Sequence, residues 1–126
     1  MSDASEVGKI GWIDITVEDA EGLRDFYSTV AGWVPSEVNM GDYSDFCMLK
    51  PGGEEPAAGI CHSRGDNAQL PAQWLIYIVV PSVDDSAALC TANGGEVLVG
   101  PKSMGEGRFA VIRDPSGATA ALYQAS

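Results

Sequence analysis

The chain has 126 residues, a net charge of −11 and a pI of about 4.1. Hydrophobic residues make up 45% of it and charged residues 20%, which is typical of a globular chain and not of a disordered one. Nucleic acids and anionic membranes are bound through clustered Lys and Arg, and the seven such residues here are spread along the sequence. We therefore expect neither as a partner.

The sequence predicts a cytoplasmic protein. Residues 1–6 (MSDASE) lack the basic and apolar regions of a signal peptide. No apolar run is long enough to span a bilayer. The three cysteines, Cys47, Cys61 and Cys90, are odd in number and lack the spacing of a metal site, as expected of free thiols in a reducing compartment.

A strand and an amphipathic helix open the first half of the chain. Residues 10–17 have the composition of a strand, with Trp12 and Asp14 on one face. Asp19 stands where a helix N-cap is expected, and Gly32 where the helix should stop. The i, i+3, i+4, i+7 spacing predicts one buried stripe on this helix. The stripe consists of Leu23, Phe26, Tyr27 and Val30. Three further strands are predicted at residues 33–38, 43–49 and 57–62.

The same order of elements recurs in the second half. A strand at residues 74–80 precedes a helix that Ser82 opens with a capping-box pattern. Strands at 96–99, 108–113 and 118–123 follow, with a tight turn at residues 114–117 before the last. The interval from Val17 to Gly32 is 15 positions, as is that from Val80 to Gly95. The sequence therefore contains an internal repeat.

Each half is too small to be stable alone, so the two halves are expected to pair and to bury their apolar sheet faces. Residues 63–71 (SRGDNAQLP) have the composition of a linker between them. We predict one α+β domain over residues 1–126, with a first module at about 8–63 and a second at about 72–124.

Motifs in both halves resemble one known family. They are Phe26-Tyr27 with Gly32-Trp33, then Gly107-Arg108, Asp114-Pro-Ser-Gly-Ala118 and Leu122-Tyr-Gln124. This pattern resembles the vicinal oxygen chelate superfamily (glyoxalase, bleomycin-resistance protein, extradiol dioxygenase), in particular its branch of predicted enzymes related to lactoylglutathione lyase. The resemblance implies two βαβββ modules that form one curved mixed sheet around a small-molecule cleft, and a homodimer.

Members of that superfamily often hold a divalent metal through the first and last strands of each module. The corresponding positions here fall near four residues without a suitable donor: Trp12, Gly59, Leu75 and Ala121. A shifted alignment offers Asp14 and Cys61 or His62 in the first module, but only Tyr77 and Tyr123 in the second. We therefore expect no metal and no other cofactor.

Asp14 is the main candidate for chemistry. On the cleft side of its strand, partial desolvation would suit its carboxyl group to act as a general base. The alternative is a carboxylate that a nearby Arg neutralises or that is hydrogen-bonded to the backbone. Arg108 is a candidate partner for an anionic group of the ligand, or a member of a surface salt bridge.

Several residues are candidates for lining the cleft. Trp12 and Tyr123 would hold a flat or cationic ligand between aromatic rings. Tyr77 is a further candidate, although it is also compatible, like Trp74 and Phe109, with the core or a subunit contact. The remaining candidates are Cys61 on its strand and Met104, which begins either a mobile flap or an ordinary turn.

Two functions from different classes remain open. The first is a metal-free binding protein for a small organic molecule. The alternative is a metal-independent lyase- or isomerase-like enzyme with Asp14 as base, in which Arg108 or Tyr123 polarises a substrate oxygen. A metal-dependent glyoxalase or dioxygenase is disfavoured by the missing donors. Whether the protein is an enzyme is left open by the sequence.

Overall fold

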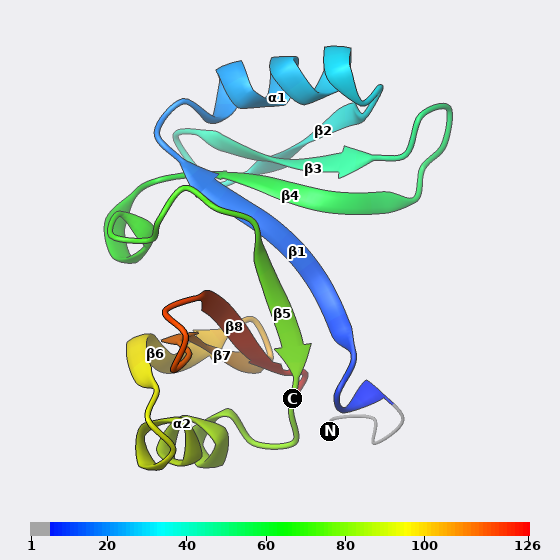
Figure 1. Ribbon diagram of the computed structural model, residues 1–126. Helices are drawn as coiled ribbons and strands as arrows, with labels where there is room; N and C mark the ends of the chain where they lie inside the picture. The colour runs from blue at the N-terminus through cyan, green and yellow to red at the C-terminus, as the bar shows by residue number, and fades with distance from the viewer. Residues whose placement is uncertain (1–5) are drawn as a thin grey trace. The chain divides into compact units, whose positions relative to one another are not determined.

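The computed structural model describes residues 6–126. Its elements, in chain order, are β1 (Ile10–Val17), α1 (Ala20–Val30), β2 (Val34–Asn39), β3 (Ser44–Leu49), β4 (Pro56–His62), the 3₁₀ helix η2 (Gly65–Asn67), β5 (Leu75–Val79), α2 (Val83–Ala92), β6 (Glu96–Met104), β7 (Gly107–Arg113) and β8 (Thr119–Gln124) (Figure 1). The predicted α+β class and the repeated β-α-β-β-β order are confirmed. The segment considered for a signal peptide lies, except for Glu6, outside the described residues.

The chain divides into two compact units. The N-terminal unit is Ile13–Trp74, and the C-terminal unit combines Leu75–Ser126 with the residues that precede Ile13. Strand β1 therefore contributes its first residues to one unit and its last residues to the other. None of the described helices has the length and apolar character that crossing a membrane requires.

The N-terminal unit has the strand order β2-β3-β4-β1. β1 runs parallel to β4, and the other neighbouring strands are antiparallel. Helix α1 lies over this part of the sheet (Figure 1). The core between them consists of Ile15, Ala20, Phe46, Met48 and Ile60.

Helix α1 begins as predicted but buries less than predicted. The carboxylate of Asp19 accepts a hydrogen bond from the backbone N–H of Gly22 at 2.9 Å. Leu23 and Tyr27 pack against the core. Phe26 and Val30 are 53% and 65% exposed, so the predicted buried stripe is wrong for these two. The helix turns only the side with Ala20, Leu23 and Tyr27 toward the sheet.

An aromatic cluster extends the core of the N-terminal unit. The ring centroids of Tyr27, Trp33 and Trp74 lie 5.4 to 5.9 Å apart. The indole N–H of Trp74 donates to the Tyr27 hydroxyl oxygen at 3.3 Å. Trp74, predicted to begin a strand of the second half, thus packs within the first, and β5 begins one residue later.

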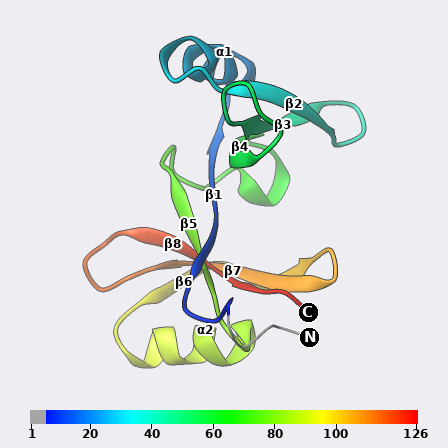
Figure 2. The ribbon, with the colours of Figure 1, turned by 90° about the vertical axis from the view of Figure 1, so that its right-hand side faces the viewer.

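The C-terminal unit has the order β5-β8-β7-β6. β5 and β8 are parallel, and β8, β7 and β6 are antiparallel. The segment leading into β1 adds to the edge of β5, where the Gly8 N–H donates to the Val79 carbonyl at 2.8 Å. Helix α2 runs along one face of these strands (Figure 2), around a core of Val83, Ala110 and Leu122. Its predicted cap is present, since Ser82 Oγ accepts from the Asp85 N–H at 3.2 Å.

Two turns position the last three strands. β6 continues to Met104, beyond the predicted end at residue 99, and Gly105 and Glu106 form the hairpin turn into β7. The turn before β8 is built by Asp114, whose Oδ1 accepts from the N–H groups of Ser116 at 2.8 Å and Ala118 at 3.1 Å. The hydrogen bond from the Ser116 hydroxyl is the largest cause of the lowered pKa of the Asp114 carboxyl, and the bonds from the backbone N–H groups add to it.

Candidate functional site

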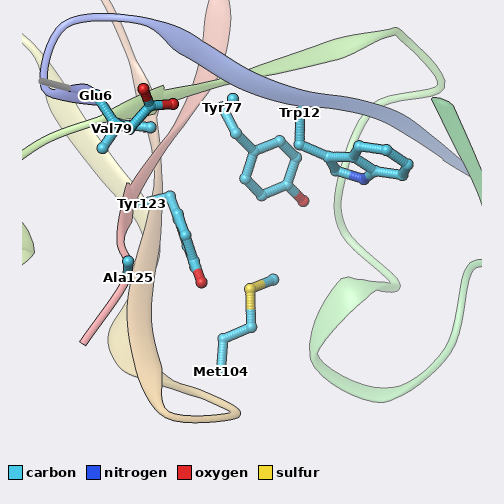
Figure 3. Close-up of a pocket in the computed structure, with 8 residues that line it drawn as sticks. Glu6, Trp12, Tyr77, Val79, Met104, Tyr123 and Ala125 are labelled. Atoms are coloured by element: carbon cyan, nitrogen blue, oxygen red, sulfur yellow. The ribbon is translucent and has the colours of Figure 1, made fainter. Parts of the chain in front are cut away.

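A cavity of about 490 Å³ lies within the C-terminal unit (Figure 3). We call it the aromatic pocket. Its lining residues are Glu6, Gly11, Trp12, Tyr77, Val79, Met104, Tyr123 and Ala125. It brings together four of the residues proposed from the sequence: Trp12, Tyr77, Met104 and Tyr123.

Strand register explains why these side chains meet. Tyr77 and Val79 are two residues apart on β5 and therefore point to the same face. Tyr123 of β8 stands opposite Val79 and joins them on that face. The alternate residues Ile78 and Leu122 face helix α2 instead. Sheet alternation thus divides each strand between a helix-facing core and the pocket.

The remaining wall comes from β1 and from the β6–β7 hairpin. Trp12 presents its indole beside Tyr77, and Met104 reaches in from the end of β6 (Figure 3). Gly11 lines the pocket without a side chain, and a Cβ there would lie only 3.0 Å from Val79 Cγ2. A side chain at this position would therefore crowd Val79, and glycine avoids this close contact.

The lining defines what the aromatic pocket can hold. Three aromatic rings and the flexible Met104 thioether offer an apolar surface for a flat ring system. The hydroxyl groups of Tyr77 and Tyr123 both extend into the space between the side chains (Figure 3). Phenols and the Glu6 carboxylate supply the few polar groups that orient a ligand in such sites.

Four lining residues were not proposed from the sequence: Glu6, Gly11, Val79 and Ala125. A signal for Val79 was present, because it follows Tyr77 by two positions in one strand. The sequence contains no comparable signal for Glu6. This residue precedes the first strand and lines the pocket because the segment leading into β1 lies along β5.

Arg108 lies elsewhere. Its guanidinium forms a two-point ion pair with Asp84 of α2, with Nε–Oδ2 and Nη2–Oδ1 distances of 2.9 and 3.0 Å. It is not among the residues that line the aromatic pocket. The geometry corresponds to the salt-bridge alternative and connects β7 to the start of α2.

Asp14 and Cys61 belong to the N-terminal unit. Asp14 is 9% exposed and stands opposite Gly59, two positions before the pair Thr16–Cys61. Burial, followed by the negative charges of Asp14 and Asp45, raises the pKa of the Cys61 thiol to about 12. The thiolate is the nucleophilic form, so Cys61 is a poor nucleophile at neutral pH.

The described residues do not fit the metal site of the resembled superfamily. The strand registers pair Asp14 with Gly59 in one unit and Tyr77 with Ala121 in the other. Only Asp14 among these four offers a carboxylate, imidazole or thiolate. Within residues 6–126, no group of three His, Cys, Asp or Glu is arranged to hold a metal ion.

Sequence comparison identifies a family over almost the whole chain. The family described as "Glyoxalase/Bleomycin resistance protein/Dioxygenase superfamily" matches residues 9–122. "Putative glyoxylase CFP32" of Mycobacterium tuberculosis is 30% identical over an alignment of 121 residues that covers 94% of this chain and 46% of that protein. "Anthracycline biosynthesis protein DnrV" of Streptomyces peucetius is 30% identical over 129 residues, covering 93% of this chain and 47% of that protein. The chain thus spans about half the length of these relatives.

Solved structures share the fold. A methylmalonyl-CoA epimerase from Mycobacterium tuberculosis matches with a TM-score of 0.59 at 16% identity, covering 100% of this chain and 93% of that one. An uncharacterized protein from Methanosarcina mazei matches with a TM-score of 0.51 at 20% identity, covering 94% of each chain. At these identities the likeness establishes the fold and not the activity.

Proposed function

This chain belongs to the Glyoxalase/Bleomycin resistance protein/Dioxygenase superfamily, and we propose that it is a metal-independent binding protein for a flat, largely apolar organic molecule. The observation that carries the proposal is the aromatic pocket of about 490 Å³, lined by Trp12, Tyr77 and Tyr123. Such a volume lies within the range of small-molecule sites. The ligand's rings would stack on the aromatic side chains, and its polar groups would meet the two phenols.

The Streptomyces relative suggests a first probe, because its name connects it with anthracyclines, which are flat and polycyclic. We expect the anthracycline daunorubicin to quench tryptophan fluorescence saturably through Trp12. Trp33 and Trp74 pack in the other unit, so the variant Trp12→Phe should lose most of the response.

A matched pair of methionine variants distinguishes binding in the aromatic pocket from nonspecific binding of the probe elsewhere on the protein. Met104 lines the pocket and is 39% exposed, whereas Met40 is 48% exposed and lies outside its lining. Met104→Ala should weaken binding about fivefold, the loss of roughly 1 kcal/mol of apolar contact. Met40→Ala should leave it unchanged. Equal effects of the two substitutions, or failure to bind any flat aromatic probe, would argue against the proposed function.

Metal independence and assembly are tested together by native mass spectrometry and elemental analysis of protein purified without chelator. We expect no stoichiometric metal or other cofactor, an unchanged affinity for the probe in EDTA, and a homodimer. The donor set at the paired strand positions supports the first expectation. A chelator-sensitive affinity would refute metal independence. A cytoplasmic location is part of the same proposal and is tested by cell fractionation.

One alternative is an enzyme of the lyase or isomerase type with the buried Asp14 as base. Asp14 belongs to the N-terminal unit and does not line the aromatic pocket, so the substrate of such an enzyme would bind at Asp14 and not in that pocket. A base that removes a proton from a C–H group would exchange that proton with solvent. In D₂O, a bound ligand should then gain deuterium with the wild type but not with Asp14→Asn, as measured by mass spectrometry. Ligand binding without any exchange would leave the binding function and exclude this alternative for that ligand.

A further inference from the structure

A second cavity, of about 420 Å³, lies in the N-terminal unit, where β1 and β4 end beside the start of β3. We call it the polar cavity. The carboxylate, imidazole and guanidinium side chains of its lining are Glu18, Glu21, Asp42, His62 and Arg64. None of them lines the aromatic pocket, which belongs to the other unit.

Asp45 fixes the chemistry of the imidazole in this cavity. Its Oδ1 accepts from the backbone N–H of His62 at 2.8 Å and lies 3.2 Å from His62 Nδ1. Both side chains are less than one-fifth exposed. An ionised carboxylate only accepts hydrogen bonds, so this contact favours the tautomer of a neutral ring that carries its proton on Nδ1. Nε2 is then the acceptor that His62 can offer to a ligand.

Aromatic neighbours restrict the ring further. The His62 ring packs edge-on against Tyr43, with centroids 5.5 Å apart, and against Phe46 at 6.1 Å. These contacts and the Asp45 hydrogen bond leave the imidazole little rotational freedom. A ligand would therefore meet an acceptor that is already oriented, which reduces the entropy lost on binding.

The charges of the lining favour a cation. The Arg64 guanidinium lies 4.0 Å above the Tyr43 ring and 3.5 Å from the Asp42 carboxylate, so its charge is already balanced. Within residues 6–126, neither Glu18 nor Glu21 forms an ion pair. The pKa of the Arg24 guanidinium is raised mainly by its hydrogen bond to Asp25, and the charge of Glu21 adds a smaller effect. Two carboxylates are thus left to attract a positively charged ligand.

We propose that the polar cavity binds an organic ammonium ion, which donates an N–H to Nε2 of His62 while Glu18 and Glu21 balance its charge. A metal ion fits less well, because no three of the described donors converge as a metal requires. An ammonium group instead donates in several directions and tolerates carboxylates at the rim. This site is independent of the proposed function of the aromatic pocket.

The experiment uses His62 itself as the reporter. It is the single histidine of the chain, so its imidazole NMR signals need no assignment by mutagenesis. Titration of the full-length chain with the diamine putrescine should shift these signals saturably. Its neutral analogue 1,4-butanediol, and MgCl₂ at equal ionic strength, should not shift them in the same way.

Charge-matched variants distinguish the site from the general acidity of the chain. Glu18→Gln with Glu21→Gln should raise the Kd for putrescine at least fivefold. Glu54→Gln with Glu55→Gln removes the same charge from the exposed segment that precedes β4, and it should change the Kd less than twofold. His62→Asn, with folding verified by circular dichroism, should also weaken binding. Because this variant lacks the imidazole reporter, its affinity for putrescine is compared with that of the wild type by isothermal titration calorimetry.

Four results would overturn the proposal. They are no saturable shift with putrescine, the same shift with MgCl₂, equal effects of the two glutamate pairs, and full affinity in His62→Asn.

Discussion

Cys61 illustrates how neighbouring groups determine the chemistry of a single residue. Cys61 lies on β4, next to the strand β1 that carries Asp14, and its thiol is within hydrogen-bonding reach of Asp45. Burial is the largest cause of its raised pKa, and the two carboxylates add to it because they repel a thiolate. The residue proposed for the ligand cleft is therefore chemically inert near neutral pH.

Neutralising one carboxylate should partly reverse this effect. In the background Cys47→Ser with Cys90→Ser, titration of thiolate absorbance should give a midpoint of about 12 for Cys61. Asp45→Asn should lower it, because a charge and a hydrogen bond that disfavour the thiolate are lost, but burial should keep it above 9. Asp25→Asn, which changes an exposed carboxylate paired with Arg24, serves as control. A parent midpoint near 9 would contradict the structure.

The same shift has a consequence for stability. The unfolded thiol loses its proton near its ordinary pKa of 9.0, whereas the folded one holds it to about 12. Between these values the unfolded state binds fewer protons, so the stability contributed by Cys61 falls as pH rises. This loss should be smaller in a Cys61→Ala variant, measured by urea unfolding at pH 8 and pH 10.

Gly107 is required for a different reason, the close approach of β7 and β8. A Cβ at this position would meet the carbonyl oxygen of Gln124 and lie 3.0 Å from that of Ala125. Neither backbone oxygen can move without disturbing the pairing of Arg108 with Gln124. Gly107→Ala should cost about 1–3 kcal/mol in urea unfolding. Gly53→Ala, whose nearest neighbours are 3.9 Å away, should cost less than about 0.5 kcal/mol. Similar costs for both would refute the argument.

Among the elements, α1 depends on its N-cap residue, Asp19. Asp19 accepts from the Gly22 N–H, one of the helix donors without a partner within the helix. Asp19→Ala should lower the free energy of unfolding by about 1 kcal/mol. Asp25→Ala removes an equally acidic side chain from the exposed part of the same helix and tests the alternative that charge alone matters. If the two variants lose equal stability, capping is not the cause.

Local signals predicted the elements well, because caps and turns act over a few residues. Asp19 and Ser82 open their helices, and Asp114 builds its turn, as the sequence indicated. The periodicity of α1 gave its apolar arc but not the part that the sheet covers, so the exposure of Phe26 and Val30 was missed. Coverage depends on neighbours distant in sequence, which no local pattern specifies.

For the aromatic pocket, too, local patterns predicted some residues, whereas contacts between residues distant in sequence were missed. Alternation along strands and the family resemblance led to Trp12, Tyr77 and Tyr123, which do line one cavity. The ion pair of Arg108 with Asp84 joins residues 24 positions apart and depends on the packing of α2 against β7. Chain topology also brings Glu6 to the pocket. Such contacts need the folded chain.

At the scale of the whole molecule, β1 connects the two units. Its last residues pair with β4 in the N-terminal unit, while the residues leading into it pair with β5 in the C-terminal unit. Removing either unit would leave part of this segment without hydrogen-bond partners, at a cost for each unsatisfied group that becomes buried. We therefore propose that residues 1–126 unfold as one cooperative domain.

A probe in each unit tests this proposal. In Trp12→Phe, the remaining fluorescence comes from Trp33 and Trp74 in the N-terminal unit. Hydrogen exchange of the β7 and β8 amides reports on the C-terminal unit. A single domain should give the same urea midpoint and the same free energy of unfolding by both probes, because all its contacts are lost together. Two separate midpoints would mean that the strand passing between the units does not couple them, and each βαβββ module would then be its own folding unit.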